Sequence, residues 1–492
     1  MLAGVMPITT ALAFEAKEPP TQVGTFIVLG KVSALADEAV RSRVPIDDEA
    51  WAAMLERLGE GGDWGASTTT WVGKTKIVLA VLPSKSSRHN TPARSWAVPN
   101  LTKTARGSRD ASILFAVDDQ SHAFPLAVAA ARAFPQYDRR SGKDKDQTVT
   151  MAALDVSTGH LVEDRRIQPA IEGVRLAGRL VDAPASELST RTFVEEAQAV
   201  AERTGAAIRV IEGEALREAG LGGLWGVGKA AEDLPALVVL EHEPPGAAMK
   251  VAWVGKGIVY DTGGLSMKGK DHMPGMKGDM GGAAAVLGAF EAAVSLELGL
   301  HIFAVLCLAE NSVGPRSTRP DDVLAMHSGK TVEVNNTDAE GRLALADGVS
   351  WIGAEEDPDV IVDLATLTGA ALITTGKVHA GVYSNDEDLE AMAVAAGKAS
   401  GDVVYPFLYA PELMRKEYKS SVADMKNSVK DRMNAQAACA GLFVEAHLHK
   451  RADDSWPRWL HVDIAGPAWN SHNRGTGFGV GLLLQLSETL AG

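Results

Sequence analysis

Four near-continuous apolar runs in the second half of the chain constrain its fold more than any other feature of the sequence. The runs are ALVVLEH, KVAWVGKG, LHIFAVLCLAE and DVIVDLATLTG, at residues 236–242, 250–257, 300–310 and 359–369. Helical patterns at residues 281–296 and 342–356 separate the last three of them. A strand that is apolar on both faces is typical of a largely parallel sheet covered by helices. We therefore predict an α/β fold whose functional residues gather at the carboxyl ends of the strands.

The first part of the chain predicts a second, smaller α/β domain. Its expected strands are short apolar runs at residues 25–30, 76–83, 112–119 and 148–156. Its expected helices are amphipathic stretches at residues 48–58 and 124–134. A helical pattern at residues 167–182 is expected to connect the two domains. The prediction is thus a smaller N-terminal α/β domain at 1–165 and a larger C-terminal domain at 166–492, whose mostly parallel central sheet is flanked by helices.

The charge balance and the cysteines narrow the class of protein. The formal net charge is −15, which argues against a protein that grips nucleic acid over its whole surface. The two cysteines, Cys307 and Cys439, lie in apolar runs and suit a reducing compartment better than a disulfide framework. No stretch approaches the ~18 apolar residues that a membrane-spanning helix needs. No Lys or Arg precedes the apolar part of the first 20 residues, so we expect no cleaved signal and a cytoplasmic protein.

The stretch NNTDAEGRLALADG, residues 335–348, places Asp338, Glu340 and Arg342 at alternate positions between apolar neighbours. A solvated surface or a metal or catalytic site could explain them, and the apolar flanks disfavour the first. In an extended segment, residues two apart face the same side. We therefore expect these three side chains to converge, with Gly341 leaving room for a substrate or an ion.

A second stretch, residues 254–286, supplies four more charged side chains. Lys256 follows an apolar strand, Asp261 begins a glycine turn, Lys268 follows seven residues later, and Asp279 precedes an expected helix start. Taken one by one, each fits a solvated loop. Together they favour a site, because glycines flank the acids and allow close backbone approach. An unpaired ammonium at the end of a buried strand would also be costly.

The two stretches together bring four carboxylates into one predicted pocket, from Asp261, Asp279, Asp338 and Glu340. Crowded carboxylates repel and raise each other's pKa values. Two divalent cations would relieve that repulsion, and carboxylate-rich ligation suits Mn²⁺, Mg²⁺ or Zn²⁺. Two metals ~3.5–4 Å apart can share a bridging water and stabilise a tetrahedral intermediate. The spacing alone does not assign a role to either lysine.

The octapeptide NTDAEGRL, residues 336–343, resembles the signature of the leucyl aminopeptidase family, which consists of two-metal, hexameric exopeptidases. VGKGIVYDTGGLSMK and MKGDMGGAAAV resemble the other metal-binding segment of that family. DLATLTGA and WLHVDIAGPAW also match it. VYDTGGLS, LAENSVGP and VADMKNSV are most similar to its probable-aminopeptidase-like branch. The resemblance covers residues from about 165 to the end and marks 166–492 as a catalytic domain.

The resemblance implies a set of metal ligands. Lys256, Asp261, Asp279 and Glu340 would hold the tighter metal. Asp261, Asp338 and Glu340 would hold the other, so that Asp261 and Glu340 bridge both. A lysine ligand must be a neutral amine, so the metal must lower its pKa well below the ~10.4 of free lysine. The implied cofactors are two divalent ions per subunit, Mn²⁺ or Zn²⁺, with Mg²⁺ or Co²⁺ as alternatives.

The resemblance also implies catalytic and substrate-binding roles. Lys268 would polarise the scissile carbonyl and stabilise the oxyanion. Arg342 would hold a bicarbonate ion that acts as general base, because arginine itself stays protonated. A metal and Asp279 would bind the free α-amino group of the substrate. The residues expected to line the substrate are Asn336, Leu367 and Gly369 along its backbone and Met276 at its side chain.

The function that follows from the resemblance is a metal-dependent aminopeptidase acting through a bridging water activated by two metals. Its partners would be short peptides with a free N-terminus and further copies of itself in a homohexamer, without membrane or nucleic acid. Two alternatives remain: a regulatory, nucleic-acid-binding member of the family, and a two-metal hydrolase of non-peptide amides. The chain departs from the family at YDTGG, where many members have Phe-Asp-Ser-Gly-Gly. It also departs at DAPASELS (182–189), where many have Asn-Pro followed by Ala-Asn-Glu.

Overall fold

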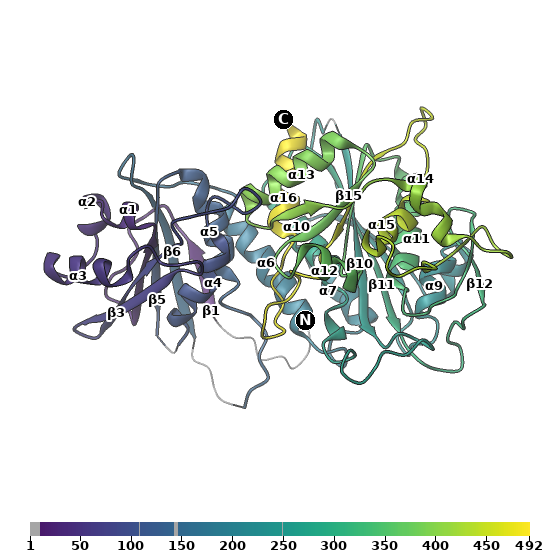
Figure 1. The fold of residues 1–492 in the computed structure, drawn as a ribbon, viewed down its shortest axis with the longest axis horizontal. Helices are drawn as coiled ribbons and strands as arrows, with labels where there is room; N and C mark the ends of the chain where they lie inside the picture. Colours follow the sequence, from purple (N-terminus) through teal and green to yellow (C-terminus); the bar gives the residue numbers. More distant parts are fainter. Residues whose placement is uncertain (1–9, 108, 142–145, 248) are drawn as a thin grey trace.

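The computed structural model describes residues 10–492 except 108, 142–145 and 248, and these residues form two packed α/β bodies (Figure 1). The apolar N-terminal residues 1–9, part of the segment in which we expected no cleaved signal, lie outside the described residues. Among the helices that are described, none is both long and apolar enough to cross a membrane.

The N-terminal body is built on a seven-stranded sheet in the order β1-β6-β5-β2-β4-β3, with β7 beside β6. The strands are β1 (Thr10–Phe14), β2 (Thr25–Gly30), β3 (Ala66–Val72), β4 (Thr75–Val81), β5 (Ala111–Val117), β6 (Gln147–Asp155) and β7 (His160–Leu161). All pairings are parallel except those of the edge strands β3 and β7. The four predicted strands are confirmed, and the sequence pattern missed β1, β3 and β7.

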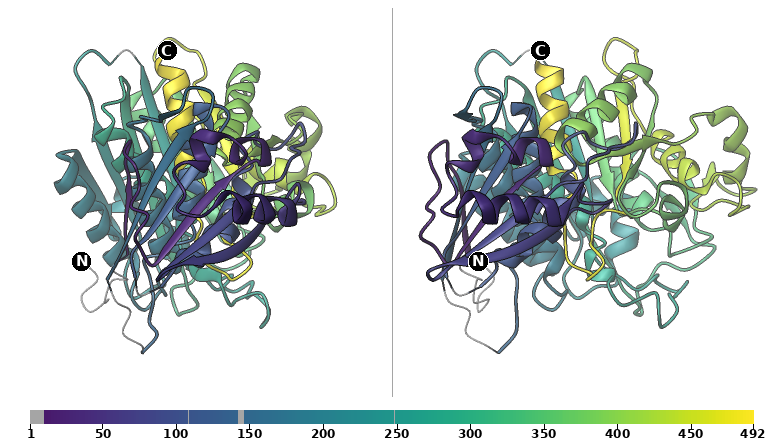
Figure 2. Two further views of the ribbon diagram at one scale, coloured as in Figure 1. Left: turned by 90° about the vertical axis from the view of Figure 1, so that its left-hand side faces the viewer. Right: turned by 60° about the vertical axis from the view of Figure 1, so that its left-hand side comes forward.

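Helices cover both faces of this sheet because its strands are apolar on both sides. One face packs on α1 (Val32–Leu35), α2 (Glu38–Arg41) and α3 (Asp48–Leu58). The other face packs on α4 (Val98–Thr102) and α5 (Ala123–Ala131). Helices α1–α3 (purple) lie on the face of this sheet that points away from the larger body. They are therefore in front in the left view of Figure 2, where the left-hand side of Figure 1 faces the viewer.

The larger body is built on an eight-stranded sheet in the order β16-β15-β18-β14-β10-β11-β9-β8. The strands are β8 (Ala207–Glu212), β9 (Ala236–His242), β10 (Lys250–Asp261), β11 (His301–Asn311), β14 (Val360–Ala365), β15 (Ala380–Ser384), β16 (Val404–Pro406) and β18 (Arg458–Asp463). The central strands β18, β14, β10 and β11 are parallel, which confirms the predicted central sheet. The flanking strands β9 and β15 run antiparallel to their central neighbours, so ALVVLEH is not a parallel strand. A small sheet of β12 (Val323–Ala325), β13 (Thr331–Glu333) and β17 (Met425–Lys426) lies outside it.

The helices of the larger body form two layers. The helices that share a core with the N-terminal body are α6 (Ile167–Asp182), α7 (Thr190–Thr204), α10 (Gly281–Ser295), α13 (Glu387–Ser400) and α16 (Val480–Ala491). The opposite layer holds α8 (Glu214–Glu218), α9 (Gly222–Gly228), α11 (Gly341–Glu356), α12 (Gly369–Thr375), α14 (Pro411–Met414) and α15 (Gln436–Glu445). Helix α10 packs against strands β10, β11 and β14 of the large sheet, and α6 packs against α10, α5 and strand β1 of the N-terminal sheet.

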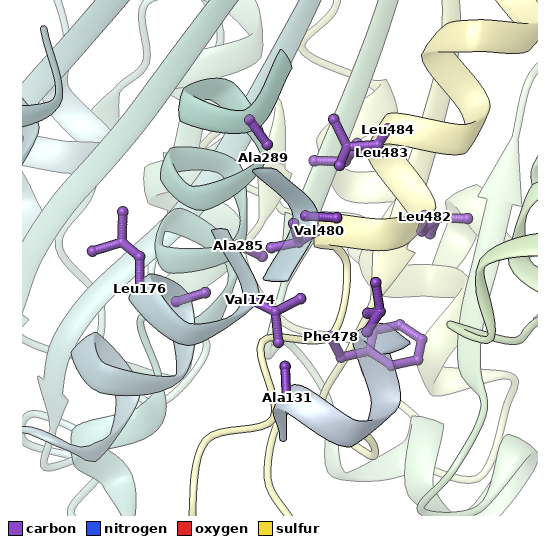
Figure 3. Packing of buried hydrophobic residues seen from close by; sticks show 14 of the residues in the cluster. Ala131, Val174, Leu176, Ala285, Ala289, Phe478, Val480, Leu482, Leu483 and Leu484 are labelled. Atoms are coloured by element: carbon purple, nitrogen blue, oxygen red, sulfur yellow. The ribbon is translucent and has the colours of Figure 1, made fainter. Parts of the chain in front are cut away.

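Helix α6 is more than the expected connector, because it belongs to the core that joins the two bodies. Figure 3 shows Val174 of α6 among Ala131 at the end of α5, Ala285 of α10 and Val480 of α16. All four side chains are buried in one continuous apolar cluster. This shared core ties the position of the N-terminal body to the elements that carry the predicted site.

Candidate metal and active site

Strand β10 carries two of the predicted metal ligands. We expected Lys256 to end the strand, but β10 continues to Asp261, and Lys256 lies in its interior with 3 % of its surface exposed. Asp261 is the last residue of β10 and pairs in register with Asn311, the last residue of β11. The two groups therefore stand at different heights on one strand, with Asp261 at the carboxyl edge of the parallel sheet.

The ammonium of Lys256 is surrounded by oxygen atoms. Lys256 Nζ lies 2.8 Å from Asp279 Oδ2 and 3.0 Å from Glu340 Oε1, and it donates a 3.0 Å hydrogen bond to the carbonyl oxygen of Thr366. Burial lowers the pKa of Lys256, but the negative charges of Asp279, Glu340 and Asp261 raise it above its ordinary value. The lysine thus occupies a place that these acids make attractive for a cation.

Gly341 provides the space for that lysine. A β-carbon built on Gly341 would lie 2.4 Å from Lys256 Cε and 2.6 Å from its Nζ. The room that we expected for a substrate or an ion is therefore taken by the Lys256 side chain.

Lys268 forms a second cluster with Asp261 and Asp338. Its Nζ lies 2.7 Å from Asp261 Oδ2 and 2.6 Å from Asp338 Oδ1. Burial lowers the pKa of Lys268, but the charge of Asp261 and the hydrogen bonds to both acids raise it overall. The sequence patterns missed Asn311, whose amide donates a 2.8 Å hydrogen bond to Asp261 Oδ1. Its signal was its place at the end of an apolar strand next to β10.

Asp338, Glu340 and Arg342 do not lie on an extended segment, so the reason we gave for their convergence is wrong. Asp338 lies in a turn after β13, Glu340 directly precedes α11, and Arg342 lies in the first turn of that helix. Glu340 already has helical dihedral angles, with φ −78° and ψ −37°. The apolar residues after Arg342 are thus the start of a buried helix. The three side chains nevertheless line one cavity, because the turn bends back toward β10.

The carboxylates fit a pair of divalent cations. Ligand oxygens of Asp261, Asp338 and Glu340 all lie within 4.8 Å of one another. Glu340 Oε2 is buried without a hydrogen-bond partner among the described residues, while Asp279 Oδ2 and Asp338 Oδ1 meet only lysine ammonium groups. Unpaired buried oxygens are costly, and clustered carboxylates are suitable ligands for Mn²⁺, Zn²⁺ or Mg²⁺.

Glu340, Asp279 and Asp338 show the raised pKa values that the sequence predicted, with burial as the largest cause. Burial raises the pKa of Glu340 and that of Asp279, and the charges of neighbouring carboxylates add to both shifts. Burial also raises the pKa of Asp338, and its bond to Lys268 offsets only part of the rise. Positive charge delivered to this cluster would be favourable for all three groups.

Arg342 is hydrogen-bonded to Tyr418, a residue that no sequence pattern had indicated. Its Nη1 donates a 3.0 Å hydrogen bond to the hydroxyl of Tyr418, which donates a 2.6 Å bond to the carbonyl oxygen of Cys439. Its Nε is buried and has no partner in the part of the chain that the structure describes. The guanidinium is therefore fixed in place, and its buried Nε–H is still unused.

One cavity of about 790 Å³ brings all the predicted site residues together. Its lining includes the proposed metal ligands, Lys268 and Arg342, and the predicted substrate-binding residues Met276, Asn336, Leu367 and Gly369. Other side chains in the lining include Ala465, Trp469 and Ile373. The segment that contains Leu367 is anchored by the buried Asp463, which accepts bonds of 3.1 Å from the Leu367 backbone and 2.7 Å from the Thr368 hydroxyl.

Comparisons with protein families cover both bodies. Residues 175–484 match the model of the cytosol aminopeptidase family catalytic domain, and residues 25–143 match M17 aminopeptidase N-terminal domain 2. The family likeness therefore extends into the N-terminal part, where the sequence had shown no motif.

Individual relatives agree with the family match. The probable aminopeptidase NPEPL1 of Homo sapiens is 50 % identical over 90 % of this chain and 84 % of its own length. Leucine aminopeptidase 1 of Caenorhabditis elegans is 41 % identical over 94 % of each chain. The structure of leucyl aminopeptidase from Trypanosoma brucei in complex with bestatin superposes with a TM-score of 0.86 at 37 % identity, covering 99 % of this chain and 96 % of the other. These relatives do not favour a nucleic-acid-binding or non-peptide alternative. The chain therefore belongs to the cytosol aminopeptidase family and is a metallo-aminopeptidase.

Proposed function

We propose that the chain hydrolyses N-terminal amino acids from short peptides with two divalent cations per subunit. Lys256, Asp261, Asp279 and Glu340 would hold one cation, and Asp261, Asp338 and Glu340 the other. The observation that carries this proposal is the cluster of three carboxylates within 4.8 Å, together with the unpartnered Glu340 Oε2. Lys256 would bind as the neutral amine, its proton exchanged for the cation that the same acids attract.

The donor set favours Mn²⁺ or Zn²⁺, with Mg²⁺ or Co²⁺ as alternatives. Most of the proposed ligands are carboxylate oxygens, which hard ions prefer, and the lysine nitrogen adds a preference for a borderline ion. When bound, two such cations supply Lewis acidity and lower the pKa of a bound water.

Lys268 is proposed to stabilise the negative charge that develops on the scissile carbonyl oxygen. Its ammonium lies at the wall of the cavity, and Asp261 and Asp338 hold it charged. Cations that balance these two acids would leave the ammonium free to donate to the substrate. A charged donor in a half-buried site is worth more to a transition state than to a neutral carbonyl.

Arg342 is proposed to hold a bicarbonate ion that accepts the proton of the attacking water. The unused buried Nε supports an anion partner, because a buried donor without a partner is costly. The bond from Arg342 to Tyr418 fixes the guanidinium, so an anion held there would have a defined position. Arginine remains protonated and cannot accept the proton itself.

The cavity lining supports the proposed substrate pose. Asp279 would bind the free α-amino group, so only a peptide with an unblocked N-terminus would satisfy this acid. Asn336, Leu367 and Gly369 would follow the substrate backbone, and Met276 would contact the N-terminal side chain. These residues line the same cavity as the metal ligands, which supports the assignment.

We further propose a cytoplasmic homohexamer with a domain boundary near residue 165. The boundary is supported by the gap between β7, which ends at Leu161, and α6, which begins at Ile167. The name of the matched family supports the location. The hexamer rests on the family resemblance and is tested by the mass of the protein in solution.

The test is a kinetic screen of the metal-free protein reloaded with Mn²⁺, Zn²⁺, Co²⁺ or Mg²⁺. Aminoacyl-aminomethylcoumarin substrates would be compared with their N-acetylated forms, and metal content would be measured in parallel. We expect two metal equivalents per subunit at full activity and no cleavage of acetylated substrates. Full activity with one equivalent would contradict the two-metal proposal, and equal cleavage of acetylated substrates would contradict the proposed amino-group recognition.

A further inference from the structure

Two walls of the cavity meet at the carboxyl end of helix α6. One wall is the short 3₁₀ turn Met276–Gly278, which carries Met276, and the other carries Trp469. Both residues line the cavity, Met276 is the residue proposed to contact the N-terminal side chain, and Gly278, two residues after it, lies against the Trp469 ring. Helix α6 ends at Asp182, whose side chain is buried with 1 % of the residue exposed.

Asp182 bonds to both walls at once. Its Oδ1 accepts a 2.8 Å hydrogen bond from the backbone of Gly475, and its Oδ2 accepts a 2.8 Å bond from Arg474 Nε. Its carbonyl oxygen accepts a hydrogen bond from Lys277 Nζ. Lys277 directly follows Met276, and the segment from Trp469 turns back through a backbone bridge between Trp469 and Gly475. Asp182 thus bonds both to the residue next to Met276 and to the segment that follows Trp469.

The two walls and the end of α6 are closely packed against one another. A β-carbon built on Gly278 would lie 3.1 Å from ring carbons of Trp469 and 3.4 Å from Val181 Cγ1. A β-carbon on Gly475 would lie 2.7 Å from the Gly178 carbonyl oxygen. The end of α6 is therefore in close contact with both walls, and a shift of this end would change the distance between them.

The N-terminal body reaches the same cluster through Tyr137. Arg474 Nη2 donates a hydrogen bond to the carbonyl oxygen of Tyr137, and Lys277 Nζ lies 5.9 Å from the centre of its ring. Tyr137 also donates a 3.2 Å hydrogen bond from its hydroxyl to Glu187. Both cationic side chains that bond to Asp182 are thus also in contact with the N-terminal body.

Asp182 is the last residue of α6, and its carboxylate is the group that contacts the Trp469 wall. A carboxylate offers an acceptor to Gly475 and another to Arg474, whereas an asparagine offers one oxygen and two amide donors. We propose that Asp182 is a positioning residue that sets the spacing of the Met276 and Trp469 walls, and so determines which N-terminal side chains the enzyme selects. This inference rests on the proposed function of the cavity.

The test compares Asp182→Asn with a matched control, Asp402→Asn. Asp402 is equally buried, is ion-paired with Arg132 of the N-terminal body, and accepts backbone bonds of 3.0 Å from Gly479 and 3.3 Å from Leu482. It is not among the residues that line the cavity. Both variants should unfold at lower temperature than the parent. Steady-state kinetics would use aminomethylcoumarin substrates with N-terminal Ala, Leu, Met and Phe.

We expect Asp182→Asn to change the ratio of kcat/KM between large and small N-terminal residues by roughly tenfold, mainly through KM, as when a side-chain pocket is altered by about one methylene. Asp402→Asn should leave that ratio unchanged. Equal ratios in Asp182→Asn and the parent would overturn the inference. If Asp182→Asn does not fold, Lys277→Met, which removes the bond to the Asp182 carbonyl together with the cation beside the Tyr137 ring, must shift the same ratio. A parent protein inactive on every substrate would contradict the proposed function and not this inference.

Discussion

Lys256 Nζ lies 3.0 Å from Glu340 Oε1, so the interior of strand β10 and the residue directly before helix α11 meet in a buried ion pair. Both residues are about 3 % exposed. The second oxygen of Glu340 has no hydrogen-bond partner among the described residues. One carboxylate oxygen of the pair therefore remains without a hydrogen bond. The pair also joins the two sequence stretches that carry the proposed ligands.

Replacing Glu340 with Ala should remove metal and activity together. The residue is proposed to bridge both cations, and its loss would also leave the buried Lys256 with one acid fewer. We expect metal content to fall below one equivalent per subunit by atomic emission, with no measurable turnover. Glu355→Ala, on the exposed face of the same helix, is the control. A Glu340→Ala protein that kept two equivalents would exclude the bridging role.

Replacing Lys268 with Ala should separate metal binding from turnover. The variant should retain two metal equivalents, because Lys268 is not a proposed ligand. Its kcat should fall by ~10²–10³, the usual cost of losing one donor to a developing oxyanion. Single-turnover kinetics on the fully loaded protein measures this. An unchanged kcat would show that another group stabilises the oxyanion.

Replacing Gly341 with Ala should displace Lys256. The added β-carbon would lie 2.4 Å from Lys256 Cε, and such overpacking costs about 1–3 kcal/mol. We expect weaker metal binding, seen as a higher metal concentration for half-maximal activity. Gly353→Ala on the same helix is a matched control, because its β-carbon would lie 3.5 Å from His449 Cβ, an ordinary contact. Identical metal titrations for both variants would contradict the close Lys256 contact.

The buried carboxyl of Asp347, which is not a proposed metal ligand, should make the stability of the protein depend on pH. It is buried in α11 and accepts backbone bonds of 2.9 Å from both Leu224 and His327. Burial raises the pKa of Asp347 to about 7, and these bonds offset only part of the shift. A raised folded-state pKa means that the contribution to stability is full below the unfolded pKa of ~3.9 and is lost as pH rises through about 7.

The corresponding experiment compares the melting temperature of Asp347→Asn and the parent between pH 4 and 8. The parent should lose stability relative to the variant as the pH rises, because only the parent must ionise a buried carboxyl. At low pH the variant should be the less stable protein, because its amide presents a donor where the structure has a backbone donor. Parallel curves for the two proteins would contradict the raised pKa.

Much of the fold and the charged residues of the proposed site could be predicted from local patterns, whereas the proposed substrate-binding residues came from the family resemblance. The central strands are apolar on both faces, and that property is visible in KVAWVG or HIFAVLCLAE without knowing their neighbours. The strand β3 could not be predicted in this way, since its side chains are half-buried or exposed. The antiparallel direction of β9 and β15 could not be predicted from their own residues either, because it depends on which strand each one pairs with.

The sequence by itself determined which side chains are available for chemistry: four acids, two lysines and an arginine, in two stretches with the spacing of a known family. Ligand type and spacing are local properties of a chain. Only the tertiary structure decided how these groups meet. It replaced the expected extended segment with a turn leading into α11, placed Asn311 beside Asp261 through strand register, and filled the space at Gly341 with Lys256. It also brought Asp182 to Arg474, 292 residues away, because contacts between distant segments are set by how helices and sheets pack and not by any pattern along the chain.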